Sequence, residues 1–227
     1  MQKKFTILFD LDGTLVDTAP DLMLAHNHVM KKFGYPTKSS EDIRNLVGKG
    51  AGAMIGRSIW GQAKKEFSKV DDQKIKDEMV KEFVNFYGKN IINKSTLING
   101  VKEFLKWCKD QDISMAVCTN KQEHLSKDLL KKIGIYDYFE FIAGSDTFDY
   151  CKPDPRHLTS VVEILDGHIN KTLMIGDSET DANAAKAAEI PVILLENGYT
   201  EKDTTEIYHN HLIKDFVDIE KIIAKYL

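Results

Sequence analysis

The amino-acid sequence predicts an α/β fold built on a doubly wound parallel sheet. Short apolar runs of about five residues recur along the chain, and segments of helical length separate them. Runs that are apolar on both faces are typical of strands buried inside a parallel sheet, with helices as the crossovers between them. One long stretch early in the chain lacks such runs, and this interruption predicts an inserted all-helical unit.

The expected strands and helices alternate over most of the chain. Apolar runs predict four strands and a weaker fifth, at residues 5–9, 113–118, 171–175, 191–195 and, for the weaker one, 139–143. The segments between them predict helices at residues 101–109, 123–132, 155–165 and 182–189. This alternation of strand and helix favours βαβ units and therefore a parallel sheet.

Residues 16–95 interrupt this rhythm. They contain no comparable strand, and their apolar side chains recur at three- and four-residue steps, as in amphipathic helices. The helical segments expected here are residues 21–33, 41–47 and 63–86. We therefore expect a discontinuous core formed by residues 1–15 and 96–227, with a helical domain at residues 16–95 inserted into it.

Composition and charge exclude several functional classes. The 227 residues carry 31 Lys and Arg against 35 Asp and Glu, a net charge of −4, which gives no overall electrostatic reason to bind nucleic acid or an anionic membrane. No apolar run approaches the ~20 residues of a membrane span. The three cysteines form no CxxC pair, so we expect neither disulfides nor zinc, and a cytoplasmic protein. Composition does not decide between a monomer and a homodimer.

Polar residues follow the expected strands where each strand ends. The segments in question are DLDGT (10–14), TNK (119–121), GDSETD (176–181) and, beyond the weaker strand, KPDP (152–155). Because the carboxyl ends of parallel strands meet at one edge of a sheet, and ligands bind there, we expect these segments to converge.

The residue types that converge indicate a site for a metal ion and a phosphate group. Four carboxylates are expected to meet, those of Asp10, Asp12, Asp177 and Asp181. Such a cluster repels itself unless a hard cation neutralises it, and carboxylate and backbone oxygens suit Mg²⁺. A cation and small hydrogen-bond donors would complete the site, namely Lys152, Thr119, Asn120 and the amide of Gly13.

Each of these residues also has a purely structural interpretation. Thr119 and Asn120 could cap the helix that follows them, and Asp181 could be a first-turn acid favoured by the helix dipole. Lys152 could be an ordinary solvated lysine. Four such coincidences at successive strand ends, all with compatible chemistry, favour the functional interpretation.

Four segments also occur in a characteristic order along the chain: FDLDGTLVDT (9–18), CTNK (118–121), CKPDP (151–155) and IGDSETD (175–181). Together they resemble the four motifs of the haloacid dehalogenase superfamily, which has a Rossmann-like core and a helical cap inserted where residues 16–95 lie. The segments DTAPDL (17–22) and LVGKGA (46–51), together with KPDP, look like the phosphoglycolate phosphatase branch of that superfamily.

The resemblance implies a division of labour among the site residues. Asp10 would be the nucleophile that forms an aspartyl-phosphate, and Asp12 the general acid for the leaving alkoxide and then the base for water. Mg²⁺ would be held by Asp10, by the backbone carbonyl of Asp12 and by Asp177. Dehalogenases of the superfamily lack an acid at the position of Asp12, so this residue disfavours dehalogenation.

The remaining core residues would bind the phosphoryl group or orient other residues. Thr119 and Asn120, with the Gly13 amide, would hold phosphoryl oxygens, and Lys152 would steady the nucleophile and the phosphate. Asp181 would orient Lys152 or metal-bound water.

The inserted helical domain contributes weaker candidates. Residues 48–53 match GxGxxA, but a dinucleotide fingerprint needs a strand before it, and the preceding segment has a helical pattern. Residues 48–53 are then either a flexible turn between helices or a loop that faces the substrate. In the second case Gly48, Lys49 and Gly50, together with Arg44, would contact the substrate.

These expectations favour a Mg²⁺-dependent phosphatase for a small phosphorylated metabolite, with 2-phosphoglycolate as the preferred substrate. Alternatives are a phosphatase for another small ester, a nucleotide or pyrophosphate, and a phosphomutase of the β-phosphoglucomutase type. Phosphonate cleavage would need a Schiff-base lysine, for which Lys49 is the candidate. A catalytically idle binding protein on this fold is disfavoured, because binding alone needs no nucleophile and acid pair.

Overall fold

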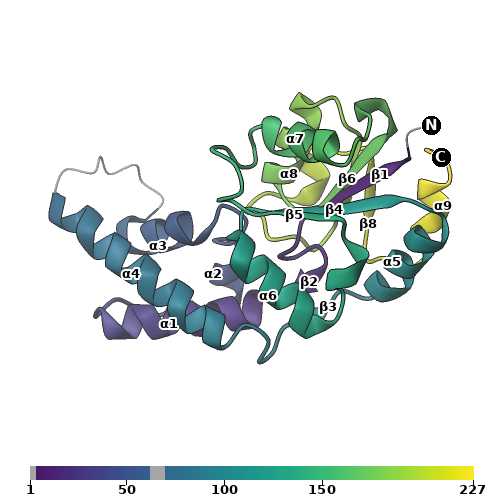
Figure 1. Cartoon of the computed structure of the whole chain (residues 1–227). Helices are drawn as coiled ribbons and strands as arrows, with labels where there is room; N and C mark the ends of the chain where they lie inside the picture. Colours follow the sequence, from purple (N-terminus) through teal and green to yellow (C-terminus); the bar gives the residue numbers. More distant parts are fainter. Residues whose placement is uncertain (1–3, 62–69) are drawn as a thin grey trace.

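A six-stranded parallel sheet forms the centre of the molecule (Figure 1). The computed structural model describes residues 4–61 and 70–227. The strand order is β5-β4-β1-β6-β7-β8, and every pairing is parallel. The strands are β1 (Thr6–Phe9), β4 (Ser114–Cys118), β5 (Phe141–Ala143), β6 (Thr172–Gly176), β7 (Val192–Leu195) and β8 (His211–Ile213). The α/β class with a doubly wound parallel sheet is therefore confirmed.

Side chains alternate between two hydrophobic cores, one on each face of the sheet. In β1, Ile7 and Phe9 belong to one core and Leu8 to the other, and all three are fully buried. The inner strands are apolar throughout because both faces are covered by helices. Register places the end of β1 beside the ends of β4 and β6, with Phe9 opposite Val117 and Ile175.

Helices cover both faces of the sheet. In Figure 1, α7 and α8 lie on one side of the sheet, and α5 and α6 lie on the other. These helices are α5 (Val101–Asp110), α6 (Glu123–Ile133), α7 (Arg156–Ile164) and α8 (Glu179–Ala187), and a short α9 (Glu220–Ile223) follows β8. Apart from the start of α8, the helices α5 to α8 begin and end within two residues of the bounds expected from sequence.

Four further helices extend away from the sheet (Figure 1). They are α1 (Ala19–Lys32), α2 (Ser40–Arg44), α3 (Ala51–Trp60) and α4 (Val70–Lys89), and α4 packs against both α1 and α3. Of the expected helix 63–86, residues 63–69 lie outside the described residues, and the rest belongs to α4. In the described part of the chain no helix has the length and apolar composition that crossing a membrane requires.

The structure differs from the sequence prediction at a few elements. Helix α8 begins at Glu179 instead of 182, because a capping box between Ser178 and Asp181 starts it earlier. Helix α3 is not among the expected helices, and its first three residues belong to the segment 48–53, for which the sequence indicates a turn or loop. The edge strand β8 escapes prediction because it is only three residues long and partly exposed.

A small antiparallel pair also escapes prediction. Strand β2 (Val16–Asp17) pairs with β3 (Thr96–Leu97), and each has only two residues. The chain therefore enters and leaves the helical region at two adjacent points, which lie beside the carboxyl end of β1.

Candidate active site

A cavity of about 270 Å³ lies at the carboxyl edge of the sheet. Its polar wall comes from the ends of β1 and β4, with Asp10 and Asp12 on one segment and Thr119, Asn120 and Lys121 on the other. The opposite wall comes from the helical region and is mostly apolar, with contributions from residues 47–54 and from Val80, Phe83, Val84 and Tyr87 of α4. The cavity therefore joins a charged floor to a largely apolar cover.

Asp10 directly follows β1 and forms a buried ion pair with Lys152. The Lys152 ammonium lies 2.7 Å from Oδ1 of Asp10 and 2.6 Å from Oδ1 of Asp181. Burial raises the pKa of Asp10 to about 6, although Lys152 opposes the shift. For Lys152, burial alone would lower the pKa, but Asp10 and Asp181 outweigh it and hold the pKa above its usual value. Lys152 therefore remains a cation beside this carboxylate.

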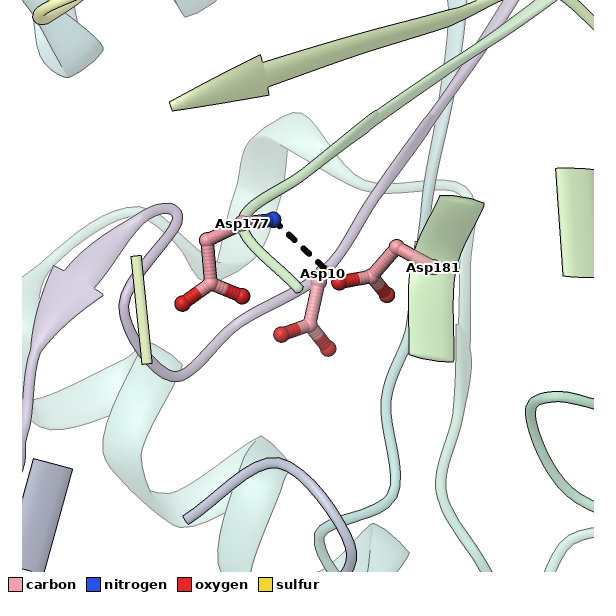
Figure 2. A group of neighbouring side chains, drawn as sticks. All are labelled: Asp10, Asp177 and Asp181. Atoms are coloured by element: carbon pink, nitrogen blue, oxygen red, sulfur yellow. Dashed lines mark hydrogen bonds between the residues drawn. The ribbon is translucent and has the colours of Figure 1, made fainter. Parts of the chain in front are cut away.

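Asp181 is fixed by hydrogen bonds on both of its oxygens. Oδ1 accepts from Lys152, and Oδ2 accepts from the hydroxyl of Ser178 at 2.7 Å and from the backbone N–H groups of Ser178 and Asp177 at 3.1 and 3.2 Å. Figure 2 shows the last of these bonds as a dashed line. Because its two oxygens bind different partners, Asp181 has two roles. Oδ2 caps the start of α8, and Oδ1 orients the Lys152 ammonium.

Asp177, at the end of β6, completes a cluster of three carboxylates (Figure 2). Asp10, Asp177 and Asp181 each contribute an oxygen, and these oxygens lie within 4.8 Å of one another. Burial raises the pKa of Asp177 well above its ordinary value, and the charges of Asp181 and Asp10 raise it further. This cluster of hard oxygen ligands is chemically suited to a divalent cation such as Mg²⁺, which would relieve the repulsion.

Asp12 points away from this cluster, toward a second buried lysine. The ammonium of Lys121 donates to both oxygens of Asp12, at 2.8 and 2.9 Å, and the Thr18 hydroxyl donates to Oδ1 at 2.7 Å. Burial would lower the pKa of Lys121, but Asp12 raises it by more than this. The same ammonium lies over the ring of Tyr87 from α4, 4.4 Å from the ring centroid.

Thr119 and Asn120 differ in which of their groups face the cavity. Oγ1 of Thr119 accepts from the backbone N–H of Lys121 at 3.2 Å, which leaves its hydroxyl hydrogen available to a ligand. The side-chain amide of Asn120 donates to the carbonyls of Gly48 and Lys152, at 3.1 and 2.9 Å. The Asn120 side chain therefore connects three loops and does not offer its N–H groups to the cavity.

The backbone N–H of Gly13 was expected to bind phosphate, but in the structure it has another partner. Its N–H donates to the carbonyl of Val16 at 2.8 Å, because the loop after β1 folds back on itself. Gly13 has φ +84°, and a Cβ at this position would overlap Oδ2 of Asp177. Here glycine is required for space and for its backbone conformation.

The candidates from the helical region fall into two groups. Gly48, Lys49 and Gly50 line the cavity with Asp10, and Gly48 accepts the hydrogen bond from Asn120. Arg44 lines a different cavity, where its guanidinium bonds Asp17 at 2.9 Å and lies 5.2 Å from the centroid of the Tyr199 ring. The structure therefore separates Arg44 from the proposed reaction centre.

The sequence indicates no role for several residues that the structure places at the site. Lys121 lies inside the segment CTNK, but nothing in that segment predicts its pairing with Asp12. Tyr199 donates its backbone N–H to Oδ2 of Asp177 at 2.6 Å and its hydroxyl to Asp17. No local pattern marks Tyr199, since its partners are 22 and 182 residues away.

Comparisons with known proteins agree with this architecture. A family model described as haloacid dehalogenase-like hydrolase matches residues 7–195. A phosphoglycolate phosphatase of Mesorhizobium japonicum is 39% identical over 210 residues, which is 92% of this chain and 90% of that protein. A phosphoglycolate phosphatase of Caulobacter vibrioides is 36% identical and aligns over 95% of this chain and 89% of its own length.

Solved structures show the same fold. The crystal structure of a predicted phosphoglycolate phosphatase from Haemophilus somnus superposes with a TM-score of 0.88 and 31% identity, covering 98% of this chain and 99% of that one. A β-phosphoglucomutase from Clostridium difficile superposes with a TM-score of 0.79 at 22% identity, covering 98% and 97% of the two chains. At that identity the second likeness concerns the fold alone.

Proposed function

The chain belongs to the haloacid dehalogenase-like hydrolases, and on this premise we propose that it is a Mg²⁺-dependent phosphatase that hydrolyses 2-phosphoglycolate to glycolate and phosphate. One observation carries the proposal. Asp10, paired with Lys152, and Asp12, two residues further on, line the same cavity, so a nucleophile and an acid can act on one ester. The similarity to proteins named phosphoglycolate phosphatase supports the choice of substrate.

Asp10 is the proposed nucleophile. Its carboxylate would attack the phosphorus atom and form an aspartyl-phosphate, while the bond from phosphorus to the ester oxygen breaks and that oxygen keeps the electron pair. A carboxylate and a phosphate dianion repel each other, so nearby cations are needed to lower the barrier. Lys152, 2.7 Å from Asp10, supplies one permanent positive charge.

Asp12 is the proposed general acid and base. In its protonated form it would give its proton to the departing glycolate oxygen, which becomes a hydroxyl group. In its ionised form it would take a proton from the water that attacks the aspartyl-phosphate, which returns Asp10 and releases phosphate. A positioned acid or base of this kind typically contributes ~10²–10⁴-fold to the rate.

A divalent cation fits the carboxylate cluster. Asp10 and Asp177 would hold Mg²⁺ with the backbone carbonyl of Asp12, while Asp181 keeps both oxygens on its present partners. When bound, the ion neutralises charge on the phosphoryl oxygens and on Asp10. The raised pKa values of Asp10 and Asp177 support this assignment, because they reflect the cost of burying these charges, increased by the neighbouring carboxylates, and a cation offsets that cost.

Phosphoryl oxygens would be bound by donors from β4 and by Lys152. The Thr119 hydroxyl is available for this purpose, whereas the Asn120 side chain is occupied by Gly48 and Lys152. We therefore assign Asn120 to phosphate binding through its backbone N–H. Gly13 contributes by leaving room for Asp177 and not by donating its amide.

The helical region is proposed to act as a cap. In this assignment residues 16–95 close over a core made of residues 1–15 and 96–227, and the adjacent strands β2 and β3 form the connection. Gly48, Lys49 and Gly50 would face the substrate at the closed interface. Arg44 would instead hold Asp17 at this connection. Closure excludes water and completes the site around a small ester.

The compartment proposed for this activity is a reducing cytoplasm. Its support is the state of the cysteines, since Cys108, Cys118 and Cys151 are all free thiols and two of them are buried. The proposed partner is a small phosphorylated metabolite.

A phosphate-release panel tests the function. Purified protein with Mg²⁺ is given 2-phosphoglycolate, sugar phosphates, a nucleotide and pyrophosphate, and kcat/KM is measured for each. We expect 2-phosphoglycolate to have the highest value, and activity to disappear with EDTA or in Asp10→Asn. A folded Asp10→Asn protein that turns over at the wild-type rate would refute the nucleophile assignment. A higher kcat/KM for another panel member would refute the substrate assignment.

A further inference from the structure

Lys121 is a buried cation at the cavity that the proposed chemistry leaves without a role. Its side chain is only 5% exposed, and its ammonium contacts Asp12 on one side and the ring of Tyr87 on the other. A buried lysine costs folding free energy unless its charge is compensated, and here Asp12 compensates it. The fold therefore keeps a permanent positive charge next to the proposed acid.

Apart from Lys152, which is assigned to Asp10 and the phosphoryl group, the cavity offers few other cations to a substrate. Among the described residues that line it, Lys49 and Lys121 are the only lysines, and no arginine lines it. Lys49 is exposed and also lines a smaller cavity of about 60 Å³ with Arg57 and Glu201. Lys121, in contrast, lies beside Asp12 under the apolar cover from α4.

The position of Lys121 relative to Asp12 defines what it can reach. To act as an acid, Asp12 must come within hydrogen-bond distance, ~2.6–3.2 Å, of the ester oxygen that leaves. The Lys121 ammonium lies 2.8 Å from Oδ1 of Asp12, so it is two hydrogen bonds away from that oxygen. In 2-phosphoglycolate the carbon atom bearing this oxygen also carries the carboxylate, which brings the carboxylate within reach of Lys121.

We propose that Lys121 binds the carboxylate of the substrate and so selects phosphate esters that carry an anionic group on the carbon next to the ester oxygen. This inference rests on the proposed phosphatase function and assigns the residue that recognises the second charge. Tyr87 and Phe83 of α4 line the same cavity and keep water from the contact. With little water present, an ammonium and a carboxylate attract each other more strongly than in solvent.

The expected contribution is moderate, because Asp12 remains an alternative partner for the ammonium. A hydrogen bond to a charged group typically changes binding by an amount that corresponds to ~10–100-fold. We therefore expect loss of the Lys121 charge to lower the preference for a carboxylated ester by this factor.

The experiment compares two nearly isosteric substrates. 2-Phosphoglycolate carries a carboxylate, and 2-phosphoglycolamide carries an uncharged amide in its place. The measured quantity is the ratio of kcat/KM for the two esters. A loss of structure or of Asp12 alignment lowers both values together and leaves the ratio unchanged, whereas loss of a carboxylate contact changes the ratio.

Lys121→Gln is the main variant, because the glutamine amide can still donate a hydrogen bond to Asp12 but has no charge. Lys121→Arg keeps the charge, and Lys49→Met tests the other cavity lysine, which is the competing candidate for the carboxylate. We expect the ratio to fall ~10–100-fold in Lys121→Gln, to recover partly in Lys121→Arg, and to fall by a smaller factor in Lys49→Met than in Lys121→Gln.

The outcomes separate the inference from the function on which it rests. Wild-type protein that shows no preference for the carboxylated ester contradicts the proposed substrate. If wild type has the preference and folded Lys121→Gln keeps it, the assignment to Lys121 is wrong. If Lys49→Met alone loses the preference, the carboxylate is bound by the loop at residues 48–50 instead.

Discussion

The backbone N–H of Tyr199 donates a 2.6 Å hydrogen bond to Oδ2 of Asp177. The same residue donates its hydroxyl to Asp17, and this hydroxyl accepts a hydrogen bond from the backbone N–H of Ala19 at 2.9 Å. One buried residue thus connects a proposed metal ligand to the point where the chain enters the helical region, through its backbone on one side and its hydroxyl on the other. Alignment of Asp177 and placement of α1 depend on the same residue through different atoms.

Tyr199→Phe separates the contribution of Tyr199 to the alignment of Asp177 from its contribution to the placement of α1. The ring and the backbone N–H remain, so we expect the Mg²⁺ concentration for half-maximal activity to change by less than about twofold. The lost hydroxyl leaves Asp17 and the Ala19 N–H with fewer partners, so the free energy of unfolding should fall by ~1–3 kcal/mol. Urea unfolding and a Mg²⁺ titration of activity measure the two effects. A large rise in the Mg²⁺ requirement would contradict this division.

Gly13→Ala should inactivate the enzyme by displacing Asp177. The added Cβ overlaps Oδ2 of Asp177, and Gly13 also has a positive φ of +84°. We expect kcat/KM to fall by ~100-fold or more, the effect of a misplaced group in a reaction centre. Gly34→Ala is the control, since Gly34 has a similar φ of +77° with no atom within 4 Å of the new Cβ. Equal losses in the two variants would attribute the effect to backbone strain alone.

Asp12→Asn should show different defects with different leaving groups. An alkoxide needs a proton to depart, so hydrolysis of 2-phosphoglycolate should slow by ~10²–10⁴-fold. Nitrophenolate departs without one, but the aspartyl-phosphate then lacks its base for hydrolysis. With p-nitrophenyl phosphate we therefore expect a rapid burst of about one nitrophenolate per enzyme, followed by a slow phase, in stopped-flow measurements. Absence of the burst, with both esters slowed equally, would argue against the acid and base role.

The stabilising effect of Mg²⁺ should depend on pH. In the metal-free protein burial raises the pKa of Asp10 to about 6, from an ordinary value of 3.8, and Asp177 is raised as well. Between these values the folded state holds a proton that the unfolded state has lost, so the contribution of Asp10 to stability falls as pH rises toward 6. Above pH 6 Asp10 is ionised, and the burial of its charge beside other carboxylates lowers the stability of the folded state, a cost that Mg²⁺ offsets. At lower pH the ion must first displace protons.

Calorimetry with MgCl₂ or EDTA, at about pH 8 and about pH 5, measures this dependence. At ~100 times the dissociation constant, a bound ion adds ~2.7 kcal/mol, which for a chain of this size corresponds to roughly 5–10 °C in Tm. We expect that shift at the higher pH and a smaller one at the lower pH. Asp177→Asn should reduce the Mg²⁺-dependent shift in Tm at both pH values. A larger Mg²⁺ effect at low pH would mean that the ion and the protons do not compete for these carboxylates.

The sequence was sufficient to predict most of the sheet, because the inner strands are apolar on both faces and polar residues follow each strand directly. Asp10, Thr119 and Asp177 could be placed at one edge for this reason alone. Helix α3 could not be predicted because its first turn, Ala51 to Ala53, follows a glycine and has the composition of a loop. Two glycines inside the helix, Gly52 and Gly56, also disfavour a helix on propensity.

Side-chain partners could not be predicted in the same way. The bond from Lys121 to Asp12 spans 109 residues, and that from Tyr199 to Asp17 spans 182. Gly13 was expected to donate its amide to phosphate, but the fold-back of its loop uses that N–H for Val16. Local pattern identifies which residues reach the edge of the sheet, whereas their pairing depends on how distant segments pack there.

The position of β1 within the sheet also determines the order in which the molecule can be assembled. Residues 6–9 leave the ribosome before both of their partners, yet they form an inner strand paired with residues 114–117 and 172–175. More than 100 further residues must therefore be synthesised before this apolar segment gains a strand on either side. At ~5–20 residues per second this takes several seconds or more, during which α1 to α4 can already pair with one another. The nascent chain can thus form these helices early, whereas the proposed reaction centre is complete only after residues 172–177 have been made.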